Sequence, residues 1–254
     1  MQYAVFRVPT ESAAAVLNAI LGKGGGSGWD QVHQIRVLVE KVDLRQGMVV
    51  FDIGANDGRW ATDLAKHLPQ ADYHLFECAP YCFEPLERNV RSLTKHTIIK
   101  KAVSNKTGTA ILHLPDAGSG LASIHKREDT SVSKHSYSQT SVSTVTIDGY
   151  ADELGFDFID VIKVDVEGHE LAVFEGASKR LSEKRIGVVF FEFSSANLNS
   201  RTFFRDFWAL FKGYGYDLYR VLPGGATLSI SRYDDSLEYF RGASNYIAIK
   251  GQPE

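Results

Sequence analysis

The sequence predicts an α/β fold built on a largely parallel β-sheet. Apolar runs of strand length alternate with amphipathic helical segments along the chain. Residues 48–58 contain a buried strand and a glycine turn, and a helical pattern follows directly. Residues 158–165 repeat this arrangement, because a second buried strand ends in an aspartate ahead of another helical pattern.

The first turn is the stretch Phe-Asp-Ile-Gly-Ala-Asn-Asp-Gly, residues 51–58. Gly54 and Gly58 allow a tight turn and a close approach of backbone to a ligand. Asp52 lies just before the turn, at the carboxyl edge where open α/β sheets bind ligands. A plain strand-to-helix turn without a ligand is the alternative interpretation.

The second strand, residues 72–76, ends in Glu77. An acid at this place in a βαβ unit can accept hydrogen bonds from two ribose hydroxyls. A dinucleotide fold prefers Gly-x-Gly-x-x-Gly, whereas this turn carries Asn56 and Asp57 between its glycines. Asp57 would repel a pyrophosphate. The turn therefore favours a ligand that brings positive charge, such as S-adenosylmethionine.

Composition excludes several classes of protein. With 254 residues, 44% of them hydrophobic and 23% charged, the chain has the composition of a soluble globular protein. A net charge of −3 gives no indication of a nucleic-acid partner, and no apolar run is long enough for a membrane span. Cys78 and Cys82 read as reduced thiols, because their spacing suits neither zinc nor a disulfide. We expect a cytoplasmic protein whose oligomeric state the sequence does not define.

Further elements are predicted from periodicity and turn residues. Helices are expected from about residue 12 to 20, at 30–42, 80–93, 148–154 and 203–211, and in the segment after residue 170. Strands are expected at 97–103, 109–114, 142–147, 158–164, 186–193, 216–222 and 246–250.

Two predictions concern the middle of the chain. We expect the strands at 97–103 and 109–114 to form a hairpin, because residues 105–108 carry a turn signal. Residues 115–141 are rich in Ser, Thr, Lys and Gly. Loops of this length are usually functional lids or disordered, and we favour a lid that closes over bound ligands.

A second informative stretch, residues 161–170, reads Val-Ile-Lys-Val-Asp-Val-Glu-Gly-His-Glu. Lys163 and Asp165 share one side of the strand, so Asp165 is the expected partner of the buried lysine. A charged turn whose acids cap the next helix is the alternative, which we favour for Glu170. For Asp165 we favour a functional role.

These motifs together resemble the FkbM family of S-adenosylmethionine-dependent methyltransferases. The resemblance rests on Phe-Asp-Ile-Gly-Ala-Asn-Asp-Gly, the following Phe-Glu, and Ile-Lys-Val-Asp-Val-Glu-Gly-His-Glu-Leu, and covers about residues 48–195. It implies a class I, Rossmann-like fold: a seven-stranded, mostly parallel sheet with its last strand antiparallel and helices on both faces. It also implies O-methylation of a hydroxyl on a sugar, polyketide or similar small molecule. We expect an N-terminal helical extension in residues 1–45 and the methyltransferase domain in residues 46–254.

The resemblance also implies roles for individual residues. The residues expected to line the methionine part of the cofactor are Asp52, Gly54, Ala55, Asn56 and Gly58. Glu77 would hold the ribose, and Ala102, Val103 and Ser104 would flank the adenine. Ser123 matches a serine-rich segment of the family, and Cys78 is placed near the cofactor by its position alone. Asp57 departs from the family pattern, where an apolar residue is usual.

For catalysis, the site must align the methyl with an acceptor oxygen and remove a proton. His169 is the first candidate for the base, because its ordinary pKa suits neutral pH. Asp165 or Glu167 would serve instead if desolvated. A divalent metal held by Asp165 and Glu192 is a further, less favoured alternative.

Two other functions compete with an O-methyltransferase. One is a nicotinamide-dependent oxidoreductase on a similar sheet, against which the glycine spacing argues. The other is a non-catalytic cofactor-binding module, against which the acids at two strand edges argue. The sequence does not identify the acceptor or the methylated position.

Overall fold

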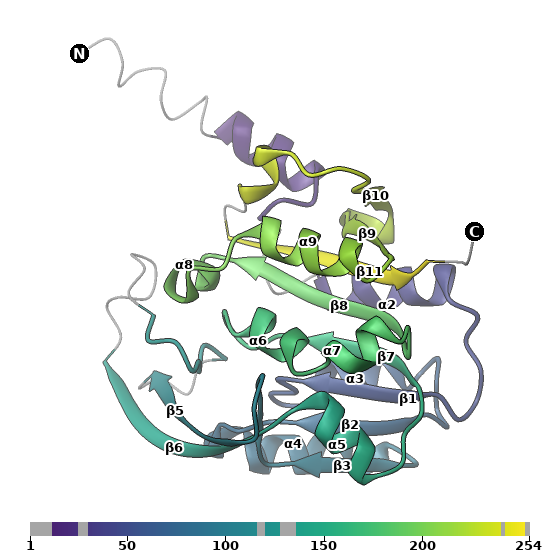
Figure 1. The fold of residues 1–254 in the computed structure, drawn as a ribbon, viewed down its shortest axis with the longest axis vertical. Helices are drawn as coiled ribbons and strands as arrows, with labels where there is room; N and C mark the ends of the chain where they lie inside the picture. Colours follow the sequence, from purple (N-terminus) through teal and green to yellow (C-terminus); the bar gives the residue numbers. More distant parts are fainter. Residues whose placement is uncertain (1–11, 25–29, 116–119, 128–135, 240–241, 252–254) are drawn as a thin grey trace.

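A twisted sheet runs through the centre of the computed structural model, with helices on both of its faces (Figure 1). The structure describes residues 12–24, 30–115, 120–127, 136–239 and 242–251. The strands of the main sheet are β1 Val49–Ile53, β2 Asp72–Phe76, β3 His96–Ile99, β7 Ile159–Val164, β8 Ile186–Ser194, β9 Tyr216–Val221, β10 Thr227–Ser229 and β11 Ala243–Lys250.

The strand order within the described residues is β10-β9-β11-β8-β7-β1-β2-β3. Strands β3, β2, β1, β7 and β8 are parallel neighbours, whereas β11 is antiparallel to both β8 and β9. The prediction of a mostly parallel class I methyltransferase sheet with an antiparallel last strand is confirmed. The short strand β10 adds an antiparallel edge beyond the expected seven strands.

The helices divide between the two faces. Helices α2 Asp30–Lys41, α3 Arg59–Leu64 and α4 Phe83–Asn89 cover one face, and α5 Ile147–Glu153, α6 Glu170–Glu175, α7 Ser178–Ser182 and α9 Phe204–Gly213 cover the other. The remaining helical segments are α8 Ala196–Ser200, η1 Pro80–Cys82, η2 Val90–Ser92, η3 Pro223–Gly225 and η4 Asp235–Glu238.

Each central strand contributes side chains to two apolar cores. Phe190 packs into the core under α2 and α3, and the next residue, Phe191, packs into the core under α6 and α9. This alternation follows from the two-residue period of a strand. Every residue of β7 is buried. Burial on both faces explains why these strands read as continuous apolar runs in the sequence.

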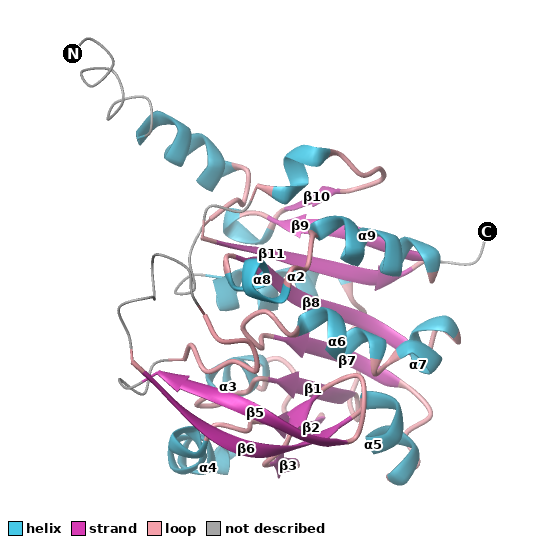
Figure 2. Cartoon of the chain, turned by 60° about the vertical axis from the view of Figure 1, so that its left-hand side comes forward, coloured by secondary structure: helices cyan, strands magenta, loops and turns pink. Residues whose placement is uncertain are grey.

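The predicted hairpin is wrong. The expected strand at 97–103 divides into β3, which joins the main sheet, and β4 Ala102–Val103, which does not. In a separate three-stranded sheet of the described residues, β6 Tyr137–Val145 lies between β4 and β5 Gly108–Pro115. Figure 2 shows this small sheet beside the β2–β3 end of the main sheet.

Strand β6 begins inside the segment predicted to be a loop, residues 115–141. Its first residues are polar and largely exposed. A strand of a small antiparallel sheet tolerates polar residues, because one face meets water. Part of the predicted lid, residues 116–119 and 128–135, lies outside the described residues.

The N-terminal region is helical at residues 12–20 and again in α2. Val37 and Leu38 of α2 are fully buried in the core beside β1. Helix α2 is therefore structurally part of the sheet's covering layer, although it belongs to the predicted extension. Among the described residues, no helix has both the length and the apolar character needed to cross a bilayer.

Candidate active site

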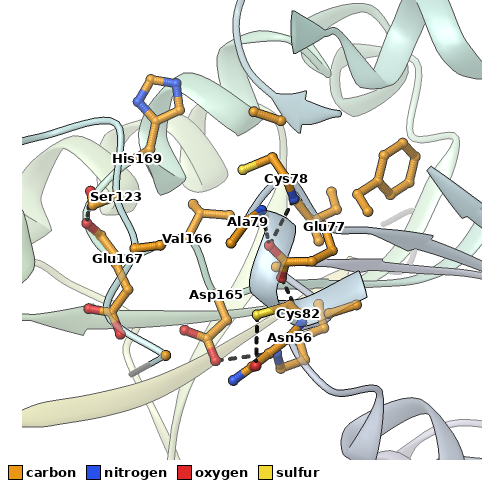
Figure 3. A pocket seen from close by; sticks show the side chains of 18 of the residues that line it. Asn56, Glu77, Cys78, Ala79, Cys82, Ser123, Asp165, Val166, Glu167 and His169 are labelled. Atoms are coloured by element: carbon orange, nitrogen blue, oxygen red, sulfur yellow. Dashed lines mark hydrogen bonds and ion pairs between the residues drawn. The ribbon is translucent and has the colours of Figure 1, made fainter. Parts of the chain in front are cut away.

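A cavity of about 360 Å³ opens at the carboxyl edge of the main sheet. It lies where the strand order reverses between β1 and β7, the place where α/β sheets bind ligands. The predicted site residues that line it are Gly54, Ala55, Asn56, Glu77, Cys78, Ala102, Val103, Ser123, Asp165, Glu167 and His169. Asp52, Gly58 and Ser104 are not part of the lining. Figure 3 shows Asn56, Glu77 and Asp165 around one part of the cavity.

Glycine is required at position 54 because the turn after β1 packs against the segment after β7. Its φ is +79°, and a Cβ placed there would lie 1.9 Å from the carbonyl oxygen of Asp165. The Asp165 N–H in turn donates to Ile53 O at 2.9 Å. Only glycine fits this junction, so Gly54 sets the position of the Asp165 backbone relative to the turn.

Gly58 and Asp52, which were expected to line the methionine part of the cofactor, lie outside the cavity lining. A Cβ at Gly58 would lie 2.6 Å from Val90 Cγ1, so this glycine allows the start of α3 to pack closely on the segment after α4. Asp52 is 0% exposed, and its Oδ1 lies 3.5 Å from Lys163 Nζ. Burial raises the pKa of Asp52, and Lys163 partly offsets this.

Lys163 connects the two acids of the strand edges. Its Nζ lies 3.3 Å from Asp165 Oδ2, as the sequence predicted, and also contacts Asp52 across the β1–β7 register. Burial acts to lower the pKa of Lys163, but Asp165 and Asp52 raise it above its ordinary value. The lysine is therefore charged at neutral pH and is neutralised by two carboxylates.

Glu77 is held by the backbone around it. Its Oε2 accepts from Asn56 N at 2.8 Å, and its Oε1 accepts from the N–H groups of Cys78 and Ala79 at 2.8 and 2.7 Å (Figure 3). Burial raises the pKa of Glu77, and these three hydrogen bonds counteract the rise. A carboxylate oxygen accepts more than one hydrogen bond, so Glu77 keeps capacity for ligand hydroxyls.

The two thiols near Glu77 are protonated at neutral pH. Burial, followed by the charge of Glu77, raises the pKa of both Cys78 and Cys82 to about 12. Cys82 Sγ lies 3.3 Å from Asn56 Oδ1, which helps to orient that side chain. Cys78 therefore lines the cavity with an uncharged side chain, as Ala102 and Val103 do.

His169 lies at the start of α6 with both ring nitrogens engaged. Nε2 lies 2.9 Å from Ser104 Oγ, and Nδ1 lies 3.1 Å from His125 Nε2. Burial, and then His125, lowers the pKa of His169 to about 4. The ring is neutral at pH 7 but has low proton affinity, so the geometry does not favour it as the base. Ser104 was expected to flank the adenine. In the structure it contacts the His169 ring and is not part of the cavity lining.

Glu167 and Ser123 form an anchor for residues 120–127. Ser123 Oγ donates to Glu167 O at 2.7 Å, and the Glu167 carboxylate forms an ion pair with buried Arg127. Arg127 also donates to Ser195 Oγ at 3.2 Å. The charge of Glu167 is thus already neutralised, which weakens its candidacy as a base.

Glu170 has a structural role, although it holds the loop before α6 and does not cap the helix as the sequence suggested. It is 1% exposed and accepts from the N–H groups of Gly168 and Val166 at 3.0 and 3.3 Å. Its second oxygen accepts from Asn197 Nδ2 at 2.9 Å. These contacts fix the loop that carries Asp165 and Glu167.

Several lining residues were not assigned to the site from the sequence. They include Gln31 and Gln34 of α2, Trp60 of α3, Lys163 of β7 and Asn245 of β11. Glu192, considered only as a metal ligand, also lines the cavity. Glu192 could be noticed in the sequence because it is a single acid within an apolar strand. Gln31 and Gln34 could not, because polar residues are expected on the exposed side of an amphipathic helix. In the described part of the chain, no group of three His, Cys, Asp or Glu side chains is placed to hold a metal.

The electrostatic setting of Glu192 differs from that of Glu77. Burial raises the pKa of Glu192 well above its ordinary value, and the neighbouring carboxylates of Asp165, Glu167 and Glu170 raise it further. A hydrogen bond with Ser194 offsets only part of this rise. Glu192 therefore holds a proton far more strongly than an exposed glutamate does.

The chain is similar in sequence to known methyltransferases. Over 179 residues, the chain is 29% identical to the 2-O-methyltransferase NoeI of Sinorhizobium fredii, covering 66% of this chain and 71% of that protein. It is 30% identical over 159 residues to the 31-O-demethyl-FK506 methyltransferase FkbM of Streptomyces tacrolimicus, covering 53% of this chain and 61% of that protein.

Among solved structures, precorrin-6y C5,15-methyltransferase from Geobacter metallireducens aligns with a TM-score of 0.46 and 11% identity. The alignment covers 87% of this chain and 88% of that one. The family model described as the methyltransferase FkbM domain matches residues 52–218, which include both strand-edge motifs. The chain therefore belongs to the FkbM family of S-adenosylmethionine-dependent methyltransferases.

Proposed function

We propose that the protein transfers the methyl group of S-adenosylmethionine to a hydroxyl of a sugar, glycan or other small molecule. The observation that carries this proposal is one cavity with two acidic ends, Glu77 at the β2 edge and Glu192 at β8. Two relatives are named as methyltransferases acting on oxygen, one at a 2-O position and one at a 31-O position. This supports oxygen as the acceptor atom.

The cavity residues fit the cofactor chemically. Glu77 retains acceptor capacity for ribose hydroxyls, and Ala102 and Val103 offer an apolar contact for adenine. Asp165 lines the cavity next to the glycine turn and would attract the cationic methionine part. When bound, the cofactor supplies an electrophilic methyl group on a positively charged sulfur. The chain itself has to position the acceptor, remove its proton and exclude water.

Residues 120–124 support a covering role for the predicted lid. Gly120, Leu121, Ala122, Ser123 and Ile124 all line the cavity. A Cβ at Gly120 would lie 3.0 Å from Asn56 Nδ2, so this segment passes directly over the glycine turn. The segment is tied down through Ser123, as described above. We propose that this part of residues 115–141 shields the bound ligands from solvent.

Two features argue against the nicotinamide alternative. Asp57 stands in the turn where a pyrophosphate would approach, and the other charged side chains that line the cavity are four acids and three bases. We keep the cytoplasmic location and the absence of a nucleic-acid partner as predictions from composition. A non-catalytic binding module would bind cofactor without turnover, so activity assays separate it from an enzyme.

The test is binding followed by transfer. Calorimetry with wild-type protein should show binding of S-adenosylmethionine and none of NAD at equal concentration. Mass spectrometry with methyl-labelled cofactor and a panel of glycosides should then find label on a product hydroxyl. Binding of NAD alone would overturn the proposal, whereas cofactor binding without transfer to any acceptor would favour the binding module.

A further inference from the structure

The strand order sets out the cavity residues in a row. Glu77 follows β2, the turn at Gly54 follows β1, Asp165 follows β7 and Glu192 lies near the end of β8. Neighbouring strands are about 4.8 Å apart, so three steps separate Glu77 from Glu192 by roughly 14 Å along the edge. If the cofactor binds over β2 and β1, the part of the cavity over β7 and β8 remains for the acceptor, and Glu192 lies there.

Asn245 and Gln34 extend this acceptor end. Asn245 of β11 is the register partner of Glu192, and its Oδ1 accepts from Gln34 Nε2 at 2.7 Å. Both side chains line the cavity, with exposures of 6% and 5%. Gln34 Oε1 has no hydrogen-bond partner among the described residues. A buried amide oxygen without a partner is costly, and a ligand hydroxyl would satisfy it.

Glu192 differs in its partners from Asp165 and Glu167, the two lining acids nearest to it in the strand order. Asp165 is paired with Lys163, and Glu167 is paired with Arg127. Within the described residues, no cation lies within ion-pair distance of Glu192, and burial, followed by its carboxylate neighbours, raises its pKa. A general base works best when its pKa lies near the operating pH, which ordinary carboxylates do not reach.

The charges at this end also select the acceptor. Lys163 is neutralised by Asp52 and Asp165, while Glu192 stands close to other carboxylates. A phosphate or carboxylate on the acceptor would be repelled here. Carboxamides, in contrast, donate to and accept from neutral hydroxyls.

Resting on the proposed function, we infer that Glu192 removes the proton from the acceptor hydroxyl and that Gln34 and Asn245 bind a neutral polyhydroxylated acceptor beside it. The O–H bond breaks, its proton passes to a Glu192 oxygen, and its electron pair forms the bond to the methyl carbon. The electrons of the donor C–S bond remain on sulfur, which becomes uncharged. Glu192 then releases the proton to solvent.

The kinetic test compares Glu192→Gln and Gln34→Leu with wild type, and uses Glu153→Gln on the exposed part of α5 as the matched control. Neutral methyl glycosides and glucose 6-phosphate serve as acceptors. Glu192→Gln should lower the transfer rate by ~10²- to 10⁴-fold. Calorimetry should show unchanged S-adenosylmethionine affinity. Gln34→Leu should raise the acceptor KM and change kcat little, and the control should behave as wild type.

The role of Glu192 can also be tested without an acceptor, through the pH dependence of the free energy of unfolding. Glu192 has a raised pKa in the folded state, so its contribution to stability is present at low pH and is lost as pH rises through that pKa. Thermal unfolding should therefore show Glu192→Gln gaining stability over wild type between pH 5 and 8. A pH-independent difference would overturn the role of Glu192.

A full transfer rate in Glu192→Gln would also overturn the assignment of Glu192 as the base. A preference for glucose 6-phosphate, or no transfer to any neutral glycoside, would overturn the neutral acceptor class. These failures differ from failure of the proposed function, in which wild type would not bind S-adenosylmethionine, or would bind it and transfer the methyl group to no acceptor at all, glucose 6-phosphate included.

Discussion

Glu77 and Glu192 occupy opposite ends of one cavity and have opposite surroundings. Glu77 accepts three backbone N–H groups, which stabilise its charge despite burial. Glu192 is surrounded by Asp165, Glu167 and Glu170, which oppose its charge. Burial raises the pKa of both groups, but the N–H donors limit the rise at Glu77 and suit it to binding hydroxyls, whereas the neighbouring carboxylates add to the rise at Glu192 and suit it to accepting a proton. The difference shows that environment, and not residue type, assigns these two acids their roles.

The largest expected effect breaks the junction on which both ends depend. Gly54→Ala would place a Cβ 1.9 Å from Asp165 O, at a backbone φ of +79°. Left-handed strain and overpacking together should cost about 3 kcal/mol or more of unfolding free energy. Chemical denaturation measures this loss directly.

Gly47→Ala is the matched control for Gly54→Ala, since Gly47 has a φ of +77° but no atom within 4 Å of an added Cβ. Its loss should be limited to the left-handed strain, ~1–2 kcal/mol. Equal losses in the two variants would mean that the contact with Asp165 contributes nothing.

The next effect tests the charged end of the comparison. Glu77→Gln should weaken S-adenosylmethionine binding by ~10- to 100-fold, because hydrogen bonds to charged groups contribute ~1.5–3 kcal/mol. Calorimetry at pH 7 measures it, with Glu84→Gln on the exposed side of α4 as control. Unchanged affinity in Glu77→Gln would remove Glu77 from the ribose role.

Much of this molecule was predictable from sequence because it follows local rules. Buried runs such as residues 159–164 and glycine turns gave the parallel sheet, and two residues of separation placed Lys163 beside Asp165. The polar first half of β6, residues 137–141, was missed, because it has no apolar alternation of its own and is stabilised by pairing with β5 across the intervening loop.

The active site was predicted less completely. The sequence showed which acids stand at strand ends but not which of them are already paired. Arg127, which neutralises Glu167, follows a polar segment with no periodic signal. His125, which occupies a nitrogen of His169, lies in the same segment. Such partners come from tertiary contacts, so the choice between His169 and Glu192 required the structure.

A smaller effect concerns His169 and pH. Its folded pKa is about 4, below the ordinary value, so it favours folding above pH 6.5 and this contribution is lost as pH falls toward 4. His169→Gln should flatten the fall in stability between pH 6.5 and 4, by at most about 1.4 kcal/mol per pH unit. Thermal unfolding across this range measures it. His67→Gln is the control, because His67 is an exposed histidine beyond α3.

An unchanged pH profile in His169→Gln would show that the ring is not held neutral by its surroundings. In that case His169 would regain its place as a candidate base, and the contrast between Glu77 and Glu192 would no longer identify the proton acceptor. Measuring the transfer rate of the same variant separates these readings, since a positioning role predicts a modest loss at all pH values.

The smallest expected effect uses the thiols as local sensors of charge. The charge of Glu77, second to burial, raises the pKa of both Cys78 and Cys82. Glu77→Gln should therefore raise the thiolate fraction and speed alkylation by less than ~10-fold, because burial remains. Glu192→Gln is the matched control, because Glu192 is absent from the causes acting on either thiol. Alkylation followed by peptide mass spectrometry reports each cysteine separately. Faster alkylation in Glu77→Gln alone would show that Glu77 is charged at neutral pH. Equal rates in wild type and both variants would show that Glu77 carries no charge there, and would remove the contrast between the two ends.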